Sequence, residues 1–286
     1  MKLVSFEWDG KSGYGIVIDE KVHAATDRFG ARYSDLRSVI AAGAIRELAG
    51  HVVDTGQAVD EVSLLPPVPN PEKILCVGVN YRPHIEEMGR EIPDHPVIFV
   101  RFPRSIVGHQ APILRPRVSS QYDFEGELAV VIGQRARYVR RENALDVVAG
   151  YTCFMDGSVR DWQRHTMQFT PGKNFDNSGA MGPCIVSSDE IPDPTRLQLT
   201  TRVNGEIMQR GRLAELVFGI PDLIEYCSTF SELTPGDIIA TGTPGGVGAA
   251  RTPPVWLTEG DRVEVEIDAI GVLASPVWDE SPTRTP

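Results

Sequence analysis

Residues 122–133, Tyr-Asp-Phe-Glu-Gly-Glu-Leu-Ala-Val-Val-Ile-Gly, place two glutamates at the start of an apolar run. The run over residues 127–132 predicts a buried strand, and side chains two apart on a strand share a face. Glu125 and Glu127 would then repel each other unless a cation lies between them, and hard divalent cations prefer carboxylate oxygens. The stretch therefore predicts part of a metal site, although a Glu-x-Glu pair alone is usually a solvated strand edge.

Short apolar runs bounded by turn formers recur along the chain and predict a mostly β protein. They cover residues 2–6, 14–18, 74–79, 97–102, 197–203, 206–209, 237–241 and 262–267. Helices are expected over residues 33–49 and 213–230, the second of them open to a break at Pro221. The prolines of residues 65–71 favour an extended linker. We therefore predict an α+β, mostly β chain with a small N-terminal α/β domain, residues 1–68, and a catalytic domain, residues 69–286.

The composition limits the function classes. The chain has 286 residues, 41% of them hydrophobic, and a formal net charge of -11, which argues against nucleic acid or an anionic membrane as a partner. No apolar run approaches the ~20 residues needed to cross a bilayer, so a cytoplasmic protein is expected. The four cysteines form no Cys-x-x-Cys pair, which indicates buried free thiols rather than a zinc or redox site. Cys153 fits a small apolar filler better than a nucleophile.

A second acidic cluster, residues 156–163, follows another apolar run and supplies Asp156 as a third carboxylate. Three protein oxygens on an octahedral ion leave about three positions for water or a chelating substrate. A helix N-terminus capped by Asp156 is an equally compatible reading. The cluster thus extends the predicted metal site by a third ligand.

Residues 80–89 read as a strand end followed by a short helix that begins at Pro83. His84 and Glu87 are three apart and share a helix face, so Glu87 can orient His84 and raise its basicity. The pair would make a general base that activates water. A lone histidine is more often structural, and Glu86 is an alternative partner.

Two glycine-bounded loops complete the candidates. Lys173 lies in Gly-Lys-Asn-Phe-Asp, but Met167 and Asn174 exclude a P-loop, which weakens any nucleotide-binding hypothesis. An isolated lysine is usually a solvated charge. Residues 242–248, Gly-Thr-Pro-Gly-Gly-Val-Gly, are compatible with either a backbone cradle for an anion or a tight turn.

Taken in order, the motifs at residues 80–87, 122–133, 156–163, 172–176 and 241–248 resemble the fumarylacetoacetate hydrolase superfamily, in its acylpyruvate hydrolase and 2-hydroxyhepta-2,4-diene-1,7-dioate isomerase-like branch. The resemblance covers roughly residues 70–270. It implies a mixed β-roll catalytic domain, a homodimer, and magnesium or manganese held by Glu125, Glu127 and Asp156, with calcium a substitute in vitro.

The resemblance also implies roles for single residues. His84 and Glu87 match a water-activating dyad, and Lys173 matches an oxyanion-stabilising lysine. Tyr81, Arg101, Arg160, Gln163 and Thr243 match or neighbour positions that contact substrate. Many members have lysine where this chain has Arg101, so its planar fork indicates either a diacid substrate or a structural ion pair.

We therefore expect a cytoplasmic metal-dependent hydrolase that cleaves a carbon-carbon bond in a small anionic 2,4-dioxo acid of the acylpyruvate or fumarylpyruvate type. Pyruvate or a related oxo acid would be released. The alternative is an isomerase, decarboxylase or hydratase/lyase of an unsaturated 2-oxo acid in the catabolism of aromatic compounds. A non-enzymatic sensor of oxo acids is the third reading, but His84, Lys173 and the three carboxylates speak against it.

Overall fold

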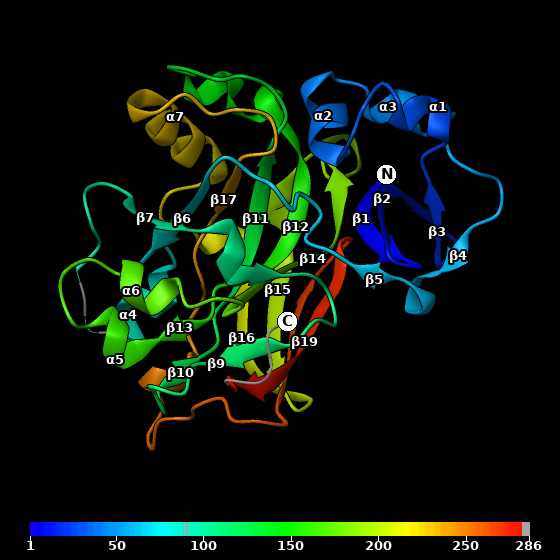
Figure 1. Ribbon diagram of the computed structural model, residues 1–286. Helices are drawn as coiled ribbons and strands as arrows, with labels where there is room; N and C mark the ends of the chain where they lie inside the picture. The colour runs from blue at the N-terminus through cyan, green and yellow to red at the C-terminus, as the bar shows by residue number, and fades with distance from the viewer. Residues whose placement is uncertain (88, 90, 282–286) are drawn as a thin grey trace.

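The computed structural model describes residues 1–87, 89 and 91–281, which form two large β-sheets and one two-stranded sheet, flanked by helices (Figure 1). The larger sheet has the order β4-β3-β2-β1-β14-β12-β11-β17-β6-β7, with β5 beside β1 and β8 beside β14. Its strands are β1 (Lys2–Trp8), β2 (Lys11–Ile18), β3 (Lys21–Ala24), β4 (Gln57–Ala58), β5 (Ser63–Leu64), β6 (Ile74–Gly78), β7 (Val97–Arg101), β8 (Ile106–Val107), β11 (Gly126–Ile132), β12 (Val148–Met155), β14 (Gly179–Ser187) and β17 (Ile238–Ala240).

The smaller sheet has the order β16-β15-β18-β19-β9, and β10 pairs with β13 apart from both. These strands are β9 (Ile113–Arg115), β10 (Tyr122–Asp123), β13 (Ser158–Val159), β15 (Gln198–Val203), β16 (Glu206–Arg212), β18 (Arg262–Ile267) and β19 (Gly271–Asp279). The helices are α1 (Asp27–Gly30), α2 (Leu36–Ala41), α3 (Ile45–Leu48), α4 (Arg82–Glu87), α5 (Arg160–Gln163), α6 (Thr170–Lys173) and α7 (Ile220–Phe230).

The two faces of β11 belong to two different apolar cores. Leu128 and Val130 pack toward the smaller sheet, whereas Ala129 and Val131 pack with residues of the N-terminal helices. This division follows from the alternation of side chains along a strand. Glu125 and Glu127 have the same parity as Ala129 and therefore lie on the face turned away from the smaller sheet.

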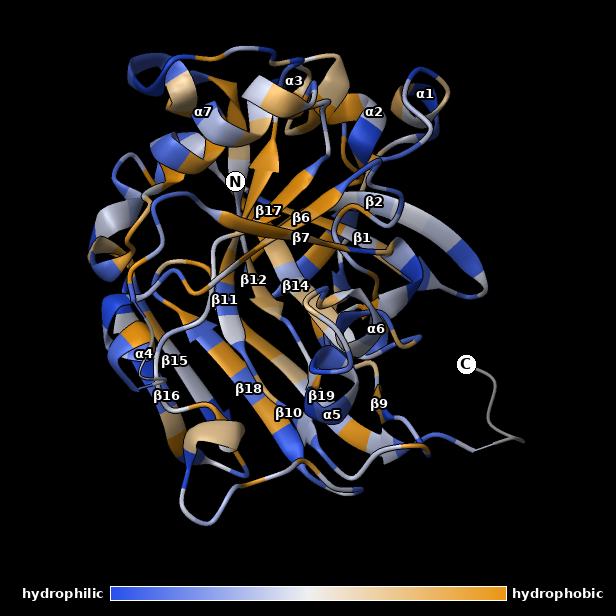
Figure 2. Ribbon diagram, turned by 90° about the vertical axis from the view of Figure 1, so that its left-hand side faces the viewer, coloured by the Kyte–Doolittle hydropathy of each residue, from blue (hydrophilic) through white to orange (hydrophobic). Residues whose placement is uncertain are grey.

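Hydropathy distinguishes the two sheets. In Figure 2 the strands β6, β7 and β17 are almost uniformly hydrophobic, whereas β18 alternates between hydrophobic and hydrophilic residues. Strands covered on both faces read as continuous apolar runs, and strands with one wet face alternate. Every residue of β11 and β12 is buried, so carboxylates at their ends are held within the protein rather than at a wet edge.

The N-terminal segment continues the larger sheet, because β1 pairs antiparallel with β14, with Lys2 opposite Val186. Helices α1 to α3 lie on this side of the molecule (Figure 1). The sheet is shared across the linker that we predict at residues 65–71. The division into domains 1–68 and 69–286 stays a prediction.

Two helix predictions needed correction. Residues 33–49 form two short helices, α2 and α3, because Gly43 between them adopts a left-handed φ of 65° that ends the first helix. Residues 213–230 contain a 3-10 turn, Leu213–Glu215, followed by α7. Pro221 lies in the first turn of α7, where its missing N–H costs no hydrogen bond, and so does not break the helix.

The strand predictions agree with the structure, including the hairpin at Asn204-Gly205 between β15 and β16. The predicted fold class, α+β and mostly β, is confirmed. Within the described part of the chain, no helix has both the length and the apolar character of a bilayer-spanning segment.

Candidate metal centre

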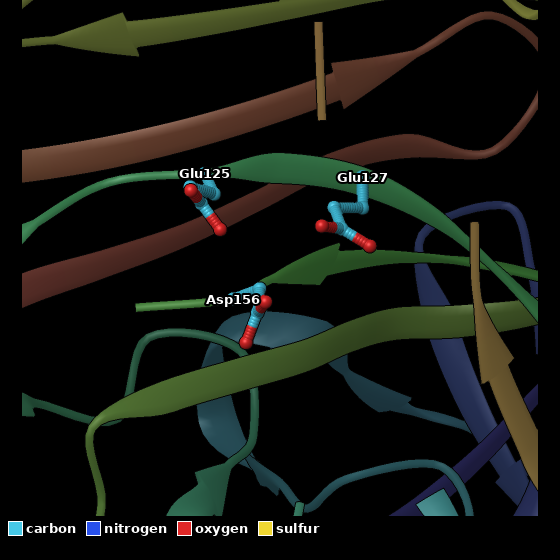
Figure 3. A group of neighbouring side chains, drawn as sticks. All are labelled: Glu125, Glu127 and Asp156. Atoms are coloured by element: carbon cyan, nitrogen blue, oxygen red, sulfur yellow. The ribbon is translucent and has the colours of Figure 1, made fainter. Parts of the chain in front are cut away.

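Three buried carboxylates meet where β11 and β12 run side by side. Glu125 precedes β11, Glu127 is its second residue, and Asp156 follows β12. The register places Glu127 opposite Phe154, and the Asp156 N–H donates to the Glu125 carbonyl oxygen at 2.8 Å. Paired residues on adjacent strands project to the same face. Figure 3 shows the three side chains converging, and one oxygen from each lies within 4.8 Å of the others.

Three buried cations surround these carboxylates. The Lys173 Nζ lies 2.5 Å from both Glu125 Oε2 and Asp156 Oδ2. Arg160 donates to Glu125 Oε1 at 2.6 Å, and Arg101 donates to Asp156 Oδ1 at 2.6 Å. Glu125 and Asp156 are thus each held by two cations.

Glu127 is the carboxylate without a cationic partner among the described residues; its Oε2 accepts the Gly242 N–H at 2.9 Å. Burial and the nearby charges of Asp156 and Glu125 raise its pKa well above the usual range. Burial would also raise the pKa of Glu125, but the charges of Arg160 and Lys173 outweigh it and lower that pKa. One carboxylate of the cluster, Glu127, therefore lacks a positively charged partner among the described residues.

This charge balance fits a divalent cation. With Asp123, four buried carboxylates face Arg101, Arg160 and Lys173, so one negative charge is left uncompensated once Glu127 is ionised. A dication would reverse that excess, and the oxygen donors Glu125, Glu127 and Asp156 suit magnesium or manganese. The predicted ligand set is therefore physically consistent with a metal site.

The predicted dyad lies beside the carboxylates. His84 Nδ1 is 3.2 Å from Glu87 Oε2, and His84 lines the same cavity of about 310 Å³ as Glu125, Glu127 and Asp156. Glu87 also accepts the Gly246 N–H, which anchors the pair to the glycine-rich loop through the glutamate. The carboxylate bonded to His84 is therefore that of Glu87 rather than that of Glu86, the alternative partner.

The glycine-rich loop does cradle anions, but they are the protein's own carboxylates. Gly242 donates to Glu127, Gly246 to Glu87, and Gly248 to Asp123. Of the two readings, the backbone cradle for an anion fits this geometry. The loop aligns three carboxylates that come from three different segments.

The predicted substrate contacts fall into two groups. Arg160, Gln163 and Thr243 line the cavity with Lys173. Tyr81 and Arg101 are not among its lining residues, and both are almost completely buried. The Tyr81 hydroxyl has no hydrogen-bond partner within the described chain. The roles of the cavity-lining residues stay predictions.

The predicted substrate contact of Arg101 needs correction. All five of its N–H groups are used inside the protein, by Asp156 and Gly157 on one side and by Ser105 and Ser178 on the other. A guanidinium with no spare donor cannot also bind a substrate carboxylate. Of the two readings of Arg101, the structural ion pair fits the geometry.

Asp123 and Gln209 are site residues that the sequence analysis missed. Asp123 accepts from Arg160, Gly248 and Ala249, while Gln209 bonds to Gly126, Thr243 and Pro244. Asp123 extends the period-two pattern of Glu125 and Glu127, so a signal was present. Gln209 lies in β16, and no pattern in the sequence marked it as a site residue.

The fold and this site define a member of the fumarylacetoacetate hydrolase family. Residues 73–278 match the family described as Fumarylacetoacetate (FAA) hydrolase C-terminal, and the chain belongs to it. The oxaloacetate tautomerase YisK of Bacillus subtilis (strain 168) is 46% identical over 224 residues, 77% of this chain and 74% of that protein. Family membership confirms the resemblance inferred from the motifs.

Two solved structures are similar over nearly the whole chain. A fumarylacetoacetate hydrolase from Exiguobacterium antarcticum has a TM-score of 0.85 and 36% identity, covering 98% of this chain and 100% of that one. Maleylpyruvate hydrolase from Sphingobium sp. SYK-6, in complex with manganese(II) and pyruvate, has a TM-score of 0.81 and 32% identity with the same coverage. Together with the three carboxylates, these relatives indicate an enzyme family that uses a divalent metal.

Proposed function

We propose that this protein is a divalent-metal-dependent tautomerase that interconverts the enol and keto forms of a small 2-oxo diacid of the oxaloacetate type. The observation that carries the proposal is the hydrogen-bonded His84 and Glu87 pair in one cavity with the three carboxylates. The relative named oxaloacetate tautomerase, 46% identical over 77% of this chain, supports tautomerisation.

Glu125, Glu127 and Asp156 would hold the ion, for which magnesium and manganese are both suitable. A bound divalent ion acts as a Lewis acid for the oxygen on carbon 2 of a 2-oxo acid. Lys173 would stabilise negative charge on the same oxygen. Two of its N–H groups bond Glu125 and Asp156, and the third has only a weak acceptor, the Asp156 carbonyl oxygen at 3.5 Å. That third donor is free to turn toward the substrate.

His84 moves the proton at carbon 3. Its Nδ1 faces Glu87, so the N–H is assigned to Nδ1 and Nε2 is the nitrogen that exchanges a proton with the substrate. Ketonisation involves no net gain or loss of protons, because Nε2 would take the proton that leaves the hydroxyl on carbon 2 and deliver it to carbon 3. Glu87 stabilises the charged imidazole that forms in the reverse direction.

Hydrolysis of a 2,4-dioxo acid is the second candidate, because the orientation of His84 by Glu87 fits a water-activating base as well as a base at carbon 3. The same pair can deliver water to the carbonyl at carbon 4, after which the bond between carbons 3 and 4 breaks and pyruvate leaves. Proton transfer at carbon 3 is common to both reactions. Decarboxylation of oxaloacetate would also release pyruvate.

The decisive experiment follows the ultraviolet absorbance of enol-oxaloacetate, acetylpyruvate and fumarylpyruvate with and without magnesium or manganese, while a coupled dehydrogenase detects pyruvate. We expect metal-dependent loss of the oxaloacetate enol without pyruvate. His84→Ala should lower kcat by roughly 10²–10⁴-fold, with metal affinity unchanged by calorimetry. His23→Ala, a change in the distant strand β3, should leave the rate unchanged.

If acetylpyruvate or fumarylpyruvate yields pyruvate with a kcat/KM comparable to that for enol-oxaloacetate, hydrolysis replaces tautomerisation as the proposed function. Pyruvate from oxaloacetate alone would indicate decarboxylation. If no substrate turns over although metal binds, the proposal of an enzyme acting on these oxo acids is wrong.

A further inference from the structure

The cations near the cavity differ in how many of their donors the protein already uses. Arg101 has none left, and Lys173 is shared between two carboxylates. Arg160 donates to Asp123, Glu125 and Gln163, which fixes its head beside the carboxylate cluster. These three cations serve the metal end of the cavity.

Arg164 is different. It lines the same cavity but is exposed, and within the described part of the chain no carboxylate lies within 4 Å of its guanidinium. The residues that follow it in the chain and also line the cavity, Thr166, Met167 and Phe169, are uncharged. Arg164 is therefore a cavity cation whose charge the described protein leaves unpaired.

The backbone of Arg164 is fixed although its side chain is exposed. Arg164 follows α5 directly, and its N–H donates to the Asp161 carbonyl oxygen at 3.2 Å. The preceding residue, Gln163, packs so closely on α6 that a Cβ at Gly172 would lie 2.4 Å from the Gln163 nitrogen. The fixed backbone keeps the Arg164 side chain within reach of the cavity, and binding a ligand then orders only that side chain.

We propose that Arg164 binds the distal carboxylate of the substrate and thereby makes the site selective for 2-oxo diacids over 2-oxo monoacids. The inference rests on the proposed function, in which the oxo group and its neighbouring carboxylate lie at the metal end. The far carboxylate then points to the rim, where the planar guanidinium can form two parallel hydrogen bonds to it. This assigns to Arg164 the role that the sequence had offered to Arg101.

The test compares the binding of oxaloacetate and pyruvate, which share the oxo acid end but differ in the distal carboxylate. Calorimetry on the manganese-loaded protein should show tighter binding of oxaloacetate. Arg164→Gln should weaken oxaloacetate binding roughly 10-fold to 100-fold and leave pyruvate and manganese binding unchanged. In turnover, the same change should raise KM more than it lowers kcat.

Two further variants make the test specific. Arg164→Lys keeps the charge but loses the fork, so it should restore part of the preference for oxaloacetate. Arg28→Gln removes an exposed arginine from α1, on the far side of the molecule in Figure 1, and should change nothing.

The outcomes separate this inference from the proposed function. Loss of the diacid preference in Arg164→Gln supports the inference even if the wild type does not tautomerise oxaloacetate. If the wild type tautomerises oxaloacetate but Arg164→Gln keeps its preference, the inference is overturned and the function stands. A wild type that binds pyruvate as tightly as oxaloacetate also overturns the inference.

Discussion

At the scale of single residues, Asp123 connects Arg160 to the glycine-rich loop. Its Oδ1 accepts the Gly248 N–H at 2.8 Å, while Oδ2 accepts the Ala249 N–H at 3.0 Å and Arg160 Nε at 2.8 Å. Asp123 is fully buried and does not line the cavity. It acts through Arg160 and the glycine-rich loop, and is therefore a positioning residue.

Replacing Asp123 by asparagine should be costly in both stability and activity. The amide lacks the charge that balances Arg160 and turns an N–H₂ group toward other donors. Because breaking a buried ion pair leaves one charge uncompensated, we expect the free energy of unfolding to fall by about 3–5 kcal/mol. Urea denaturation measures this, and kcat/KM should fall together with stability.

Asp176→Asn is the matched control. Asp176 pairs with Arg104 on the surface, where both side chains are more than half exposed, so the change should cost less than about 1 kcal/mol. Equal losses in the two variants would contradict the special role assigned to Asp123.

At the scale of elements, the site depends on how closely two short helices approach. Gly172 in α6 lies against Gln163 in α5, and Lys173 is the next residue in the chain. Isolated helices of four residues are unstable in water, so packing rather than propensity holds these two in place. The position of the lysine is therefore determined by this contact.

Gly172→Ala tests this contact. The added Cβ would meet the Gln163 backbone, which cannot rotate away, so α6 must shift and carry Lys173 with it. We expect about 1–3 kcal/mol of destabilisation and a drop in kcat with metal bound. Gly30→Ala, in α1 with no atom within 4 Å of the new Cβ, should retain wild-type stability and rate; a similar rate for Gly172→Ala would show that the helices adjust freely.

At the scale of the whole molecule, the larger sheet joins the N-terminal segment and the metal centre, and the centre carries excess negative charge. A metal that binds only the folded state stabilises the whole chain by about 2.7 kcal/mol when its concentration is a hundred times Kd. Chelation should therefore lower the melting temperature of the entire protein rather than loosen one loop.

Glu127→Gln removes the charge of this carboxylate but keeps the size of the side chain, and so tests how the charge affects stability. In the folded protein Glu127 holds its proton more tightly than a free carboxyl of pKa 4.5, so the stability of the metal-free protein falls as pH rises above that value. We expect Glu127→Gln to flatten this decline, to raise the melting temperature at pH 8 in EDTA, and to abolish the gain from manganese. A metal-free variant less stable than the wild type at pH 8 would contradict this charge balance.

The sequence alone predicted the fold class, many of the strands and the candidate residues for the chemistry, but not the nine-residue strands β14 and β19. Alternation along a strand is a local rule, so residues 122–133 placed Glu125 and Glu127 on one face before any neighbour was known. The pair of His84 and Glu87 is local in the same way, since three residues span most of one helical turn.

Only the tertiary structure decided which charges are already paired. Arg101 and Arg164 are both arginines near predicted site residues, yet one has every donor satisfied by segments up to 77 residues away and the other has no carboxylate within reach in the described chain. Sequence spacing cannot show this, because hydrogen bonds between distant segments depend on how the strands and helices pack. For the same reason the partners of Asp123 and Gln209, on the glycine-rich loop, became visible only in the folded chain.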